Sequence, residues 1–261
     1  LVRLLADKDL RAAVIPLLGT AADSAVAAVG LIAHFPSLNP VDRTAALAAL
    51  TSRPVLALPL LRAVAAGGFD KQALTALHAR QLRNLKNPEV TALLDRAWGK
   101  TSDSSADMKA TVARLRRTYN EAPVWSYDVA AGKKVFERSC VACHATEGAT
   151  VGKLGPDLSG TWRNGLDYFL ENIVDPNAVV GADYQLNLIT QRDGTVISGM
   201  LDKETATALV VRTMTETVTI PKTEIKAREV TPQSLMPPGL LEALPEREAV
   251  ELLKFLTTEG K

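Results

Sequence analysis

Apolar positions follow helical spacing through residues 1–120, which carry almost no strand signal. Asn39-Pro40 and Asn87-Pro88 each look like a helix start, because Asn caps a helix N-terminus and Pro fits its first turn. Leucines at helical spacing follow Asp70. The pattern predicts helices of about 10 to 16 residues joined by short breaks, as in stacked helix pairs. An irregular helical bundle fits the same pattern, because the internal repeat is degenerate.

The pattern changes in residues 184–230, which are rich in Thr, Val and Ile. Leu186, Leu188 and Thr190 alternate with other positions, and Asp193-Gly194 then marks a hairpin turn. This predicts a small curled sheet or barrel. Its further strands are expected at 195–201, 207–212, 217–220 and 224–230.

Helical spacing frames this β-rich stretch on both sides. Residues 128–139 predict a short helix in which Gly132 lets another helix approach closely and Phe136 covers a core. Residues 245–258 predict a closing helix with an apolar face. We therefore expect a mainly α protein with a small β insertion. The expected parts are a helical domain (1–120), a linker (121–127), a second helical domain (128–183 and 231–261) and the inserted β subdomain (184–230).

The most specific chemical signal is the pentapeptide from Cys140 to His144, CVACH, which holds both cysteines of the chain. C-x-x-C-H is the attachment pattern of a c-type haem. Each thiol can form a thioether with a haem vinyl group, and the adjacent imidazole can reach the iron from one side. This spacing predicts one covalent haem c bound through Cys140 and Cys143, with His144 as an iron ligand.

Three other interpretations of the pentapeptide remain open but fit less well. A structural zinc site needs about four nitrogen or sulfur ligands, and no other cysteine is present. A thioredoxin-like pair belongs at a strand-to-helix turn, whereas here a helix is expected before the motif and a loop after it. A disulfide between Cys140 and Cys143 would leave His144 without a role.

A sixth iron ligand is expected from the segment Ser234-Leu235-Met236-Pro237, because a thioether sulfur is a soft ligand suited to haem iron. Met236 is therefore the predicted distal ligand. The alternatives are two methionines in or beside strand patterns, Met200 and Met214, for which packing roles are expected, and Met108, which has core spacing on a helix. Two histidines are further alternatives, His78 on a helix face and His34 near a helix end.

The order of these motifs resembles class I cytochrome c. The resemblance rests on the run from Gly132 to Phe136, on CVACH, on Leu154-Gly155-Pro156-Asp157-Leu158, on the Met-Pro pair and on the closing helix. It implies that His144 is the proximal ligand, that Met236 is the distal ligand, and that the Pro156 carbonyl receives the Nδ1 proton of His144. Such a bond fixes the ring and raises its basicity.

From Tyr127 onward the chain is similar, more narrowly, to the haem-binding domain of the Planctomycetes/Verrucomicrobia type. The shared features are Val174-Asp175-Pro176-Asn177, a tyrosine near Tyr184, the run from Asp193 to Gly199, and Ser234-Leu235-Met236-Pro237 before a helix. The preceding half resembles the HEAT-like segment that often stands before this domain. The expected fold is thus a HEAT-like α-helical array followed by a cytochrome c domain with an inserted sheet.

The predicted function is single-electron transfer by a haem protein that is not itself an enzyme. Leu154, Leu158, Leu235 and Trp162 are expected to wall the haem, and Trp162 and Arg163 to contact its propionates; a core tryptophan and a surface arginine fit equally well. Two other hypotheses stay open. In the first, the distal position of the haem is open and the protein senses small ligands or carries out peroxide chemistry. In the second, the helical array binds a partner and the haem only stabilises the fold.

Charge and hydropathy limit the expected partners and location. The chain has 30 basic and 29 acidic residues and a net charge of +1. This balance does not show the excess of positive charge that is typical of nucleic-acid-binding proteins. No apolar run approaches the roughly 18 residues of a membrane span. The resemblance implies a periplasmic or otherwise exported protein, and we expect this chain to be the C-terminal part of a longer one. Its expected partner is a redox protein or an upstream dehydrogenase domain.

Overall fold

The computed structural model describes residues 1–146 and 149–258 and divides the chain into two compact units. The first unit is Leu1–Thr101 and the second begins at Ser102. The predicted boundary at residue 120 therefore falls inside the second unit. Residues 147–148 and 259–261, which the sequence analysis assigned to the cytochrome domain, lie outside the described residues.

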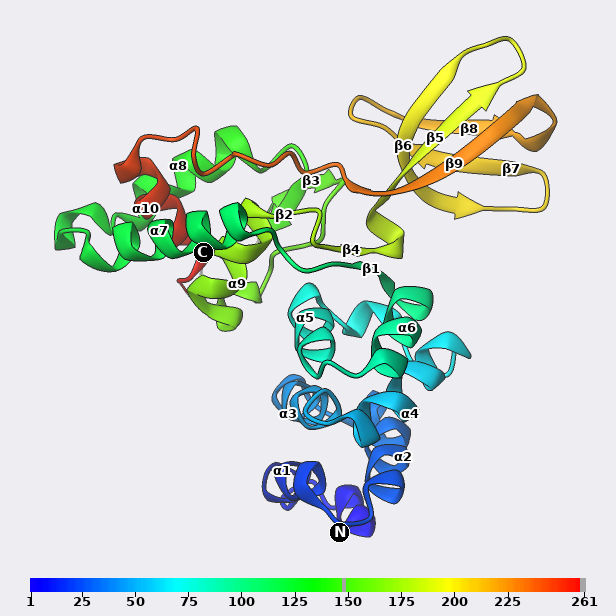
Figure 1. Cartoon of the computed structure of the whole chain (residues 1–261), viewed down its shortest axis with the longest axis vertical. Coiled ribbons are helices and arrows are strands. Elements are labelled where there is room, and N and C mark those ends of the chain that lie inside the picture. Colours follow the sequence, from blue (N-terminus) through cyan, green and yellow to red (C-terminus); the bar gives the residue numbers. More distant parts are fainter. Residues whose placement is uncertain (147–148, 259–261) are drawn as a thin grey trace. The chain divides into compact units, whose positions relative to one another are not determined.

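The first unit is helical, as predicted (Figure 1). Asn39 and Asn87 accept hydrogen bonds from the first backbone amides of their helices, which confirms the two predicted helix starts. The helices are α1 (Arg11–Thr20), α2 (Ser24–His34), α3 (Pro40–Leu50), α4 (Pro54–Ala65), α5 (Ala76–Asn84) and α6 (Pro88–Ala97), with 3-10 turns η1 (Val2–Ala6), η2 (Phe35–Ser37) and η3 (Lys71–Ala73) and the short strand β1 (Gly99–Thr101).

These helices stack with alternate neighbours. α1 packs on α3, α2 on α4 and α4 on α6. The interfaces are apolar, and Leu31, Leu50, Leu60 and Leu94 are each fully buried. The packing explains why leucines recur at helical spacing along this half of the chain. A HEAT-type repeat remains a prediction.

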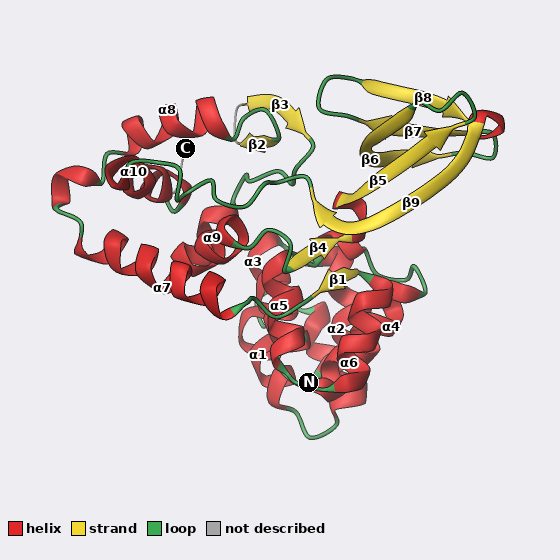
Figure 2. Cartoon of the chain, turned by 45° about the horizontal axis from the view of Figure 1, so that its top comes forward, coloured by secondary structure: helices red, strands yellow, loops and turns green. Residues whose placement is uncertain are grey.

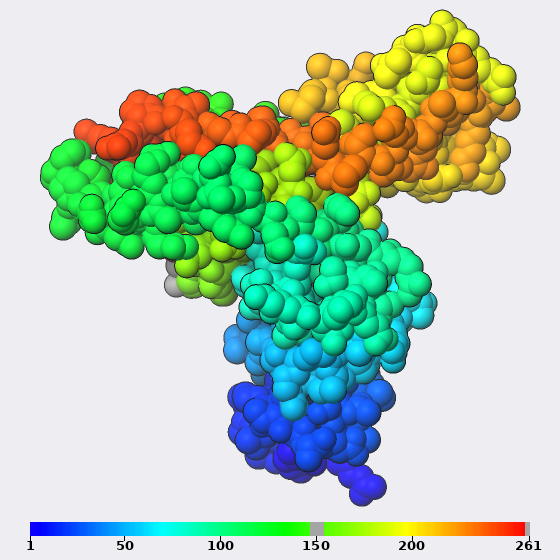
Figure 3. All heavy atoms as spheres, in the orientation of Figure 1, coloured from blue at the N-terminus to red at the C-terminus, as the bar shows by residue number. Residues whose placement is uncertain are grey.

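The second unit combines four helices of the described chain with a sheet. Two helices appear as predicted, α8 (Val129–Ser139) and α10 (Glu246–Leu256). A third, α9 (Gly165–Val174), is absent from the predictions. The fourth, α7 (Ala106–Glu121), packs against α9 and α10. Figure 3 shows the green segment that contains α7 beside the orange-red segment that leads into α10 on one face of this unit.

The predicted N-terminal helical domain, 1–120, includes α7. In the structure, α7 instead belongs to the second unit. Val112 and Leu115 are buried in the core of the second unit, and Met108 packs against the same core. Helical spacing correctly marks a buried face but does not tell which partner buries it.

The predicted linker 121–127 is also part of the second unit. The 3-10 turn η4 (Val124–Ser126) follows α7, and Ser126 is buried. The Tyr127 hydroxyl donates a 2.6 Å hydrogen bond to the backbone oxygen of Tyr119, and the two rings meet edge to face. These contacts fix the turn between α7 and α8.

Gly132 allows the close crossing of α8 and α10. A Cβ atom built on Gly132 would lie 2.0 Å from the Glu251 backbone oxygen and 2.8 Å from the Cβ of Phe255. Beside this contact, the rings of Phe136 and Phe255 have centroids 5.4 Å apart. The predicted roles of Gly132 and Phe136 are thus confirmed at the crossing of α8 and α10.

The inserted sheet appears where the alternation predicted it (Figure 2). Gly194 adopts a φ of +93° in the first hairpin turn, a conformation that glycine tolerates best. The order is β8-β7-β6-β5-β9, and every pair is antiparallel. Ile189, Leu209, Val211 and Ile220 form its core. The strands are β5 (Gln185–Gln191), β6 (Val196–Glu204), β7 (Ala208–Arg212), β8 (Thr217–Pro221) and β9 (Ile225–Ser234).

Shorter elements connect the sheet to the helices. β2 (His144–Thr146) and β3 (Ala149–Lys153) pair as an antiparallel hairpin after the pentapeptide, where a loop was expected. The remaining elements of this unit are the strand β4 (Val179–Gly181) and the 3-10 turns η5 (Thr161–Asn164), η6 (Ala182–Tyr184) and η7 (Lys222–Glu224).

No single helix in the described part of the chain is long and apolar enough to cross a membrane. α3 and α4 reach the required length and hydropathy only together, with a bend of 116° between them.

Candidate haem site

Both cysteines and His144 leave the backbone from one tight turn at the end of α8. The Cys140 carbonyl oxygen accepts hydrogen bonds from the backbone amides of Cys143 at 3.0 Å and of His144 at 2.9 Å. These bonds form a further hydrogen-bonded turn directly after Ser139, the last residue of α8. The two thiols and the imidazole are therefore grouped at one end of the helix.

A backbone carbonyl orients the imidazole of His144. Its Nδ1 lies 2.9 Å from the Pro156 oxygen. A carbonyl can only accept a hydrogen bond, so Nδ1 carries the proton, and in the neutral ring Nε2 keeps its lone pair. Burial lowers the pKa of His144, and the bond to Pro156 only partly opposes this effect. The ring is thus held neutral, in the tautomer that a metal ligand needs. The predicted contact between His144 and Pro156 is confirmed.

Gly155 forms the surface against which this ring lies. A Cβ atom built on Gly155 would be 2.5 Å from Cε1, 2.7 Å from Nδ1 and 2.9 Å from Nε2 of His144. The Gly155 amide also donates a 2.7 Å bond to the Cys143 oxygen. Gly155 belongs to the motif from Leu154 to Leu158 but was not among the predicted site residues. The signal was its place directly before Pro156.

The two thiols are free in the structure, so the disulfide interpretation is not supported. Burial, together with the charge of Cys143, raises the pKa of Cys140 to about 11, and burial also raises the pKa of Cys143. Both groups are therefore protonated thiols at neutral pH. A protonated thiol has the atoms that a thioether bond to a vinyl group requires, one sulfur and one hydrogen to add across the double bond.

Met236 packs against the same apolar core as Cys140 and Leu158. It follows β9 by two residues and precedes Pro237 and Pro238. Its backbone amide donates a 3.1 Å bond to the Ser234 hydroxyl. Chain segments around positions 140, 158 and 236 thus meet on one core, as the prediction of a shared site requires.

The remaining predicted wall residues lie in the same unit. Leu154 is buried, and Leu235 and Trp162 are half-buried. The Arg163 guanidinium stacks on the Trp162 ring with 4.5 Å between Cζ and the ring centroid. Since Arg163 is exposed, this pair presents a cation and an indole at the surface of the unit. Contact of either residue with haem propionates stays a prediction.

The rival methionines occupy other environments. Met200 is fully buried in β6 of the sheet, and Met214 is 63% exposed in the turn after β7. Met108 packs on the core from α7. The packing roles predicted for Met200 and Met108 agree with these positions, whereas the packing role predicted for Met214 is wrong, because its side chain is exposed.

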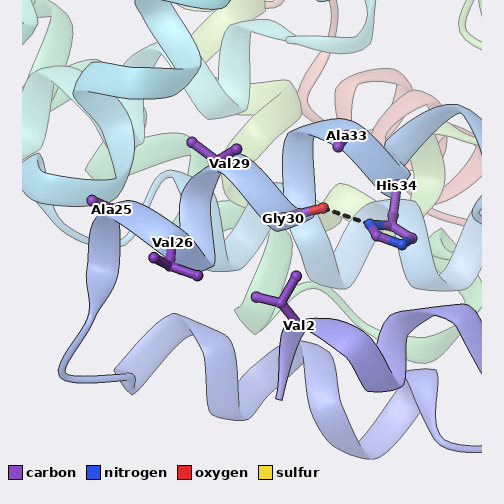
Figure 4. Close-up of a pocket in the computed structure, with 7 residues that line it drawn as sticks. All are labelled: Val2, Ala25, Val26, Val29, Gly30, Ala33 and His34. Atoms are coloured by element: carbon purple, nitrogen blue, oxygen red, sulfur yellow. Dashed lines mark hydrogen bonds between the residues drawn. The ribbon is translucent and has the colours of Figure 1, made fainter.

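The two other histidines belong to the first unit. His34 stands at the rim of an apolar depression of about 460 Å³ beside Val26 and Val29, and its Nδ1 donates to the Gly30 oxygen at 2.9 Å (Figure 4). His78 accepts a 3.1 Å bond from the Thr75 amide as part of a capping box. Each histidine thus has a local role in its helix.

A metal site made of several histidine, cysteine or acidic ligands does not fit the part of the chain that the structure describes. Within the described ranges, no group of three such residues could hold an ion. A structural zinc site is therefore not supported.

The donors fit an iron porphyrin instead. They are two free thiols, one neutral imidazole with a fixed tautomer and one thioether on the same core. Residues 129–209 match the family model of cytochrome c.

The matched segment begins at α8, includes the cysteines and His144, and ends in the sheet before Met236. The match supports a cytochrome c-like haem-binding module in this segment and, at the level of that family, haem-based electron transfer. A search of the curated proteins found no match.

Proposed function

We propose that this chain transfers single electrons through one haem c, which Cys140 and Cys143 would attach and whose iron His144 and Met236 would bind. The observation that carries the proposal is the His144 ring, which is fixed between the Gly155 backbone and the Pro156 carbonyl and belongs to the same backbone turn as the two cysteines. Haem supplies an iron centre that cycles between the ferric and ferrous states.

The protein's own groups favour such a cycle without loss of a ligand. The bond from Nδ1 to the Pro156 oxygen raises the basicity of Nε2 and keeps the ring from turning. Met236 lies on an apolar core that includes Phe169 and Leu170, which are nearly or fully buried. An apolar surrounding disfavours the more highly charged ferric site, and methionine ligation raises the potential further.

A cytochrome of this kind acts between a donor and an acceptor. We place it in an exported, larger redox protein or beside a redox partner protein, with a dehydrogenase region as donor. The family match supports haem-based electron transfer, and thioether attachment is typical of exported proteins. The Planctomycetes/Verrucomicrobia-type identity of the domain and the HEAT-like nature of the first unit belong to the same proposal.

Voltammetry with optical spectra of the exported, matured protein tests this function. We expect one reversible one-electron wave, a six-coordinate low-spin spectrum in both oxidation states, and a methionine–iron charge-transfer band at the red edge of the ferric spectrum. Met236→Ala should abolish that band and lower the potential, whereas Met214→Ala is the matched control and should change neither. A high-spin ferric wild type that binds added ligands readily would favour an open distal site instead.

A further inference from the structure

The inserted sheet ends two residues before Met236, and its first and last strands, β5 and β9, pair with each other at the base of the sheet, where the chain enters and leaves it. Gln185, the first residue of β5, pairs with Ser234, the last residue of β9. Building on the proposed function, we infer that this base positions Met236 as an iron ligand, with Asn177 and Ser234 as the positioning residues.

Two hydrogen bonds connect Met236 to the helical part of the unit. The Asn177 side-chain oxygen accepts a 2.9 Å bond from the Ser234 amide. The Ser234 hydroxyl in turn accepts a 3.1 Å bond from the Met236 amide. Asn177 lies between α9 and β4, and α9 contributes to the core on which Met236 packs. The bonds therefore fix Met236 relative to that core.

An irregularity in β9 sets the direction of the chain at this point. Leu186 pairs with Thr231, whereas its neighbour Gln185 pairs with Ser234, so β9 has a bulge that contains Pro232. A bulge bends its strand and aims the residues that follow. The bulge is thus placed where β9 leaves the sheet and the Met236 segment begins.

Pro237 restricts the same segment from the other side. A residue before proline is confined to extended conformations. Met236 therefore has its amide held by Ser234, its backbone restricted by Pro237 and its side chain packed on the core with Cys140. Each restraint lowers the number of positions that the thioether sulfur can occupy.

The two hydrogen bonds, from the Ser234 amide to Asn177 and from the Met236 amide to Ser234, set how large an effect on ligand binding is expected. Asn177 is exposed, so its bond competes with water. Loss of one such bond shifts an equilibrium by about two- to tenfold. An external imidazole that competes with Met236 for the ferric iron should therefore bind about two- to tenfold more tightly when either bond is removed.

The test uses the matured protein and four variants at the base of the sheet. Asn177→Ala and Ser234→Ala remove the acceptors, whereas Asn177→Asp and Ser234→Thr keep them. Thr205→Ala is the matched control, because the Thr205 hydroxyl accepts from the amides of Thr207 and Ala208 in the turn between β6 and β7 of the same sheet. Imidazole affinity, the methionine–iron band and denaturant stability are measured for each.

The inference predicts tighter imidazole binding and a weaker band in both alanine variants, near wild-type values in the two conservative variants, and no change in Thr205→Ala. Hydrogen exchange of the Met236 amide in the ferrous protein should also quicken in Ser234→Ala. Equal imidazole affinity in all five variants would overturn the inference.

The same spectra separate this inference from the proposed function. A wild type with covalent haem and a methionine–iron band, but with alanine variants that bind imidazole as wild type does, retains the function and rejects the positioning. A wild type with covalent haem and no such band rejects both Met236 as ligand and the inference, while haem attachment stands. A protein without covalent haem rejects the proposed function itself.

Discussion

The imidazole of His144 lies so close to Gly155 that no side chain fits between them, since an added Cβ would come within 2.5 Å of Cε1. In the sequence, His144 is the first residue of the β2–β3 hairpin, and Gly155 follows the last residue of that hairpin by two positions. The contact joins the end of α8 to the loop that contains Pro156. It makes the geometry of the proximal ligand depend on a backbone position rather than on a side chain.

Gly155→Ala should displace the His144 ring and weaken its bond to Pro156. Overpacking of this kind costs about 1–3 kcal/mol. We expect a lower haem content after maturation, a lower free energy of unfolding and a changed potential, measured by absorbance, denaturant titration and voltammetry. Gly68→Ala is the control, because its added Cβ would meet only the Ala63 oxygen, at 3.7 Å. Unchanged spectra and stability in Gly155→Ala would contradict the described contact.

Gly132→Ala should separate α8 from α10. The added Cβ would lie 2.0 Å from the Glu251 backbone oxygen, which cannot rotate away as a side chain could. We expect the free energy of unfolding of the second unit to fall by about 1–3 kcal/mol, as measured by denaturant titration. Lys133→Ala, at an exposed position of the same helix, should leave the stability near that of wild type.

A chain that starts at Asp128 should be less stable than one that starts at Ser102. Removal of α7 exposes the part of the core that Val112 and Leu115 cover. Burial of each such side chain contributes about 1.5–3 kcal/mol. Thermal unfolding of the two matured polypeptides should show a clear difference in midpoint. Equal midpoints would show that α7 is dispensable for the haem unit.

Acid should destabilise the first unit through His78. Burial lowers the pKa of His78 from 6.5 to about 4. Between about pH 6.5 and pH 4 the unfolded chain therefore binds more protons than the folded chain, and stability falls as the pH falls. We expect this histidine to account for about 2 kcal/mol of lost stability between pH 7 and pH 5.

His78→Gln is the matched variant for this prediction. Glutamine retains a side-chain acceptor for the Thr75 amide, as in other capping boxes, but does not titrate. Its free energy of unfolding should change less between pH 7 and pH 5 than that of wild type. An NMR titration that places the pKa of His78 near 6.5 would refute the account.

Elements whose structure depends on residues close together in the sequence could be predicted from the sequence pattern alone. The apolar face of α8, the caps at Asn39 and Asn87, and the Asp193-Gly194 turn all fix structure through neighbours in sequence. The bond between His144 and Pro156 was predictable only because the motif order resembles that of a known family.

Contacts between distant segments were harder to predict. α7 has a clear apolar face, but that pattern fits either unit, and only packing on α9 and α10 decides. α9 itself was not predicted, although Leu166, Phe169, Leu170 and Ile173 have helical spacing. The pairing of Gln185 with Ser234 depends on a bulge that alternation does not reveal.

The mass of the exported, matured chain, together with its pyridine haemochrome spectrum, tests the central claim most directly. We predict a mass gain of one haem, a c-type spectrum, and pigment that stays with the protein in acidified organic solvent. The double variant Cys140→Ala and Cys143→Ala should lose all three properties. A wild-type chain that gains no mass, or that releases its pigment into the solvent, would contradict the assignment of a covalent haem.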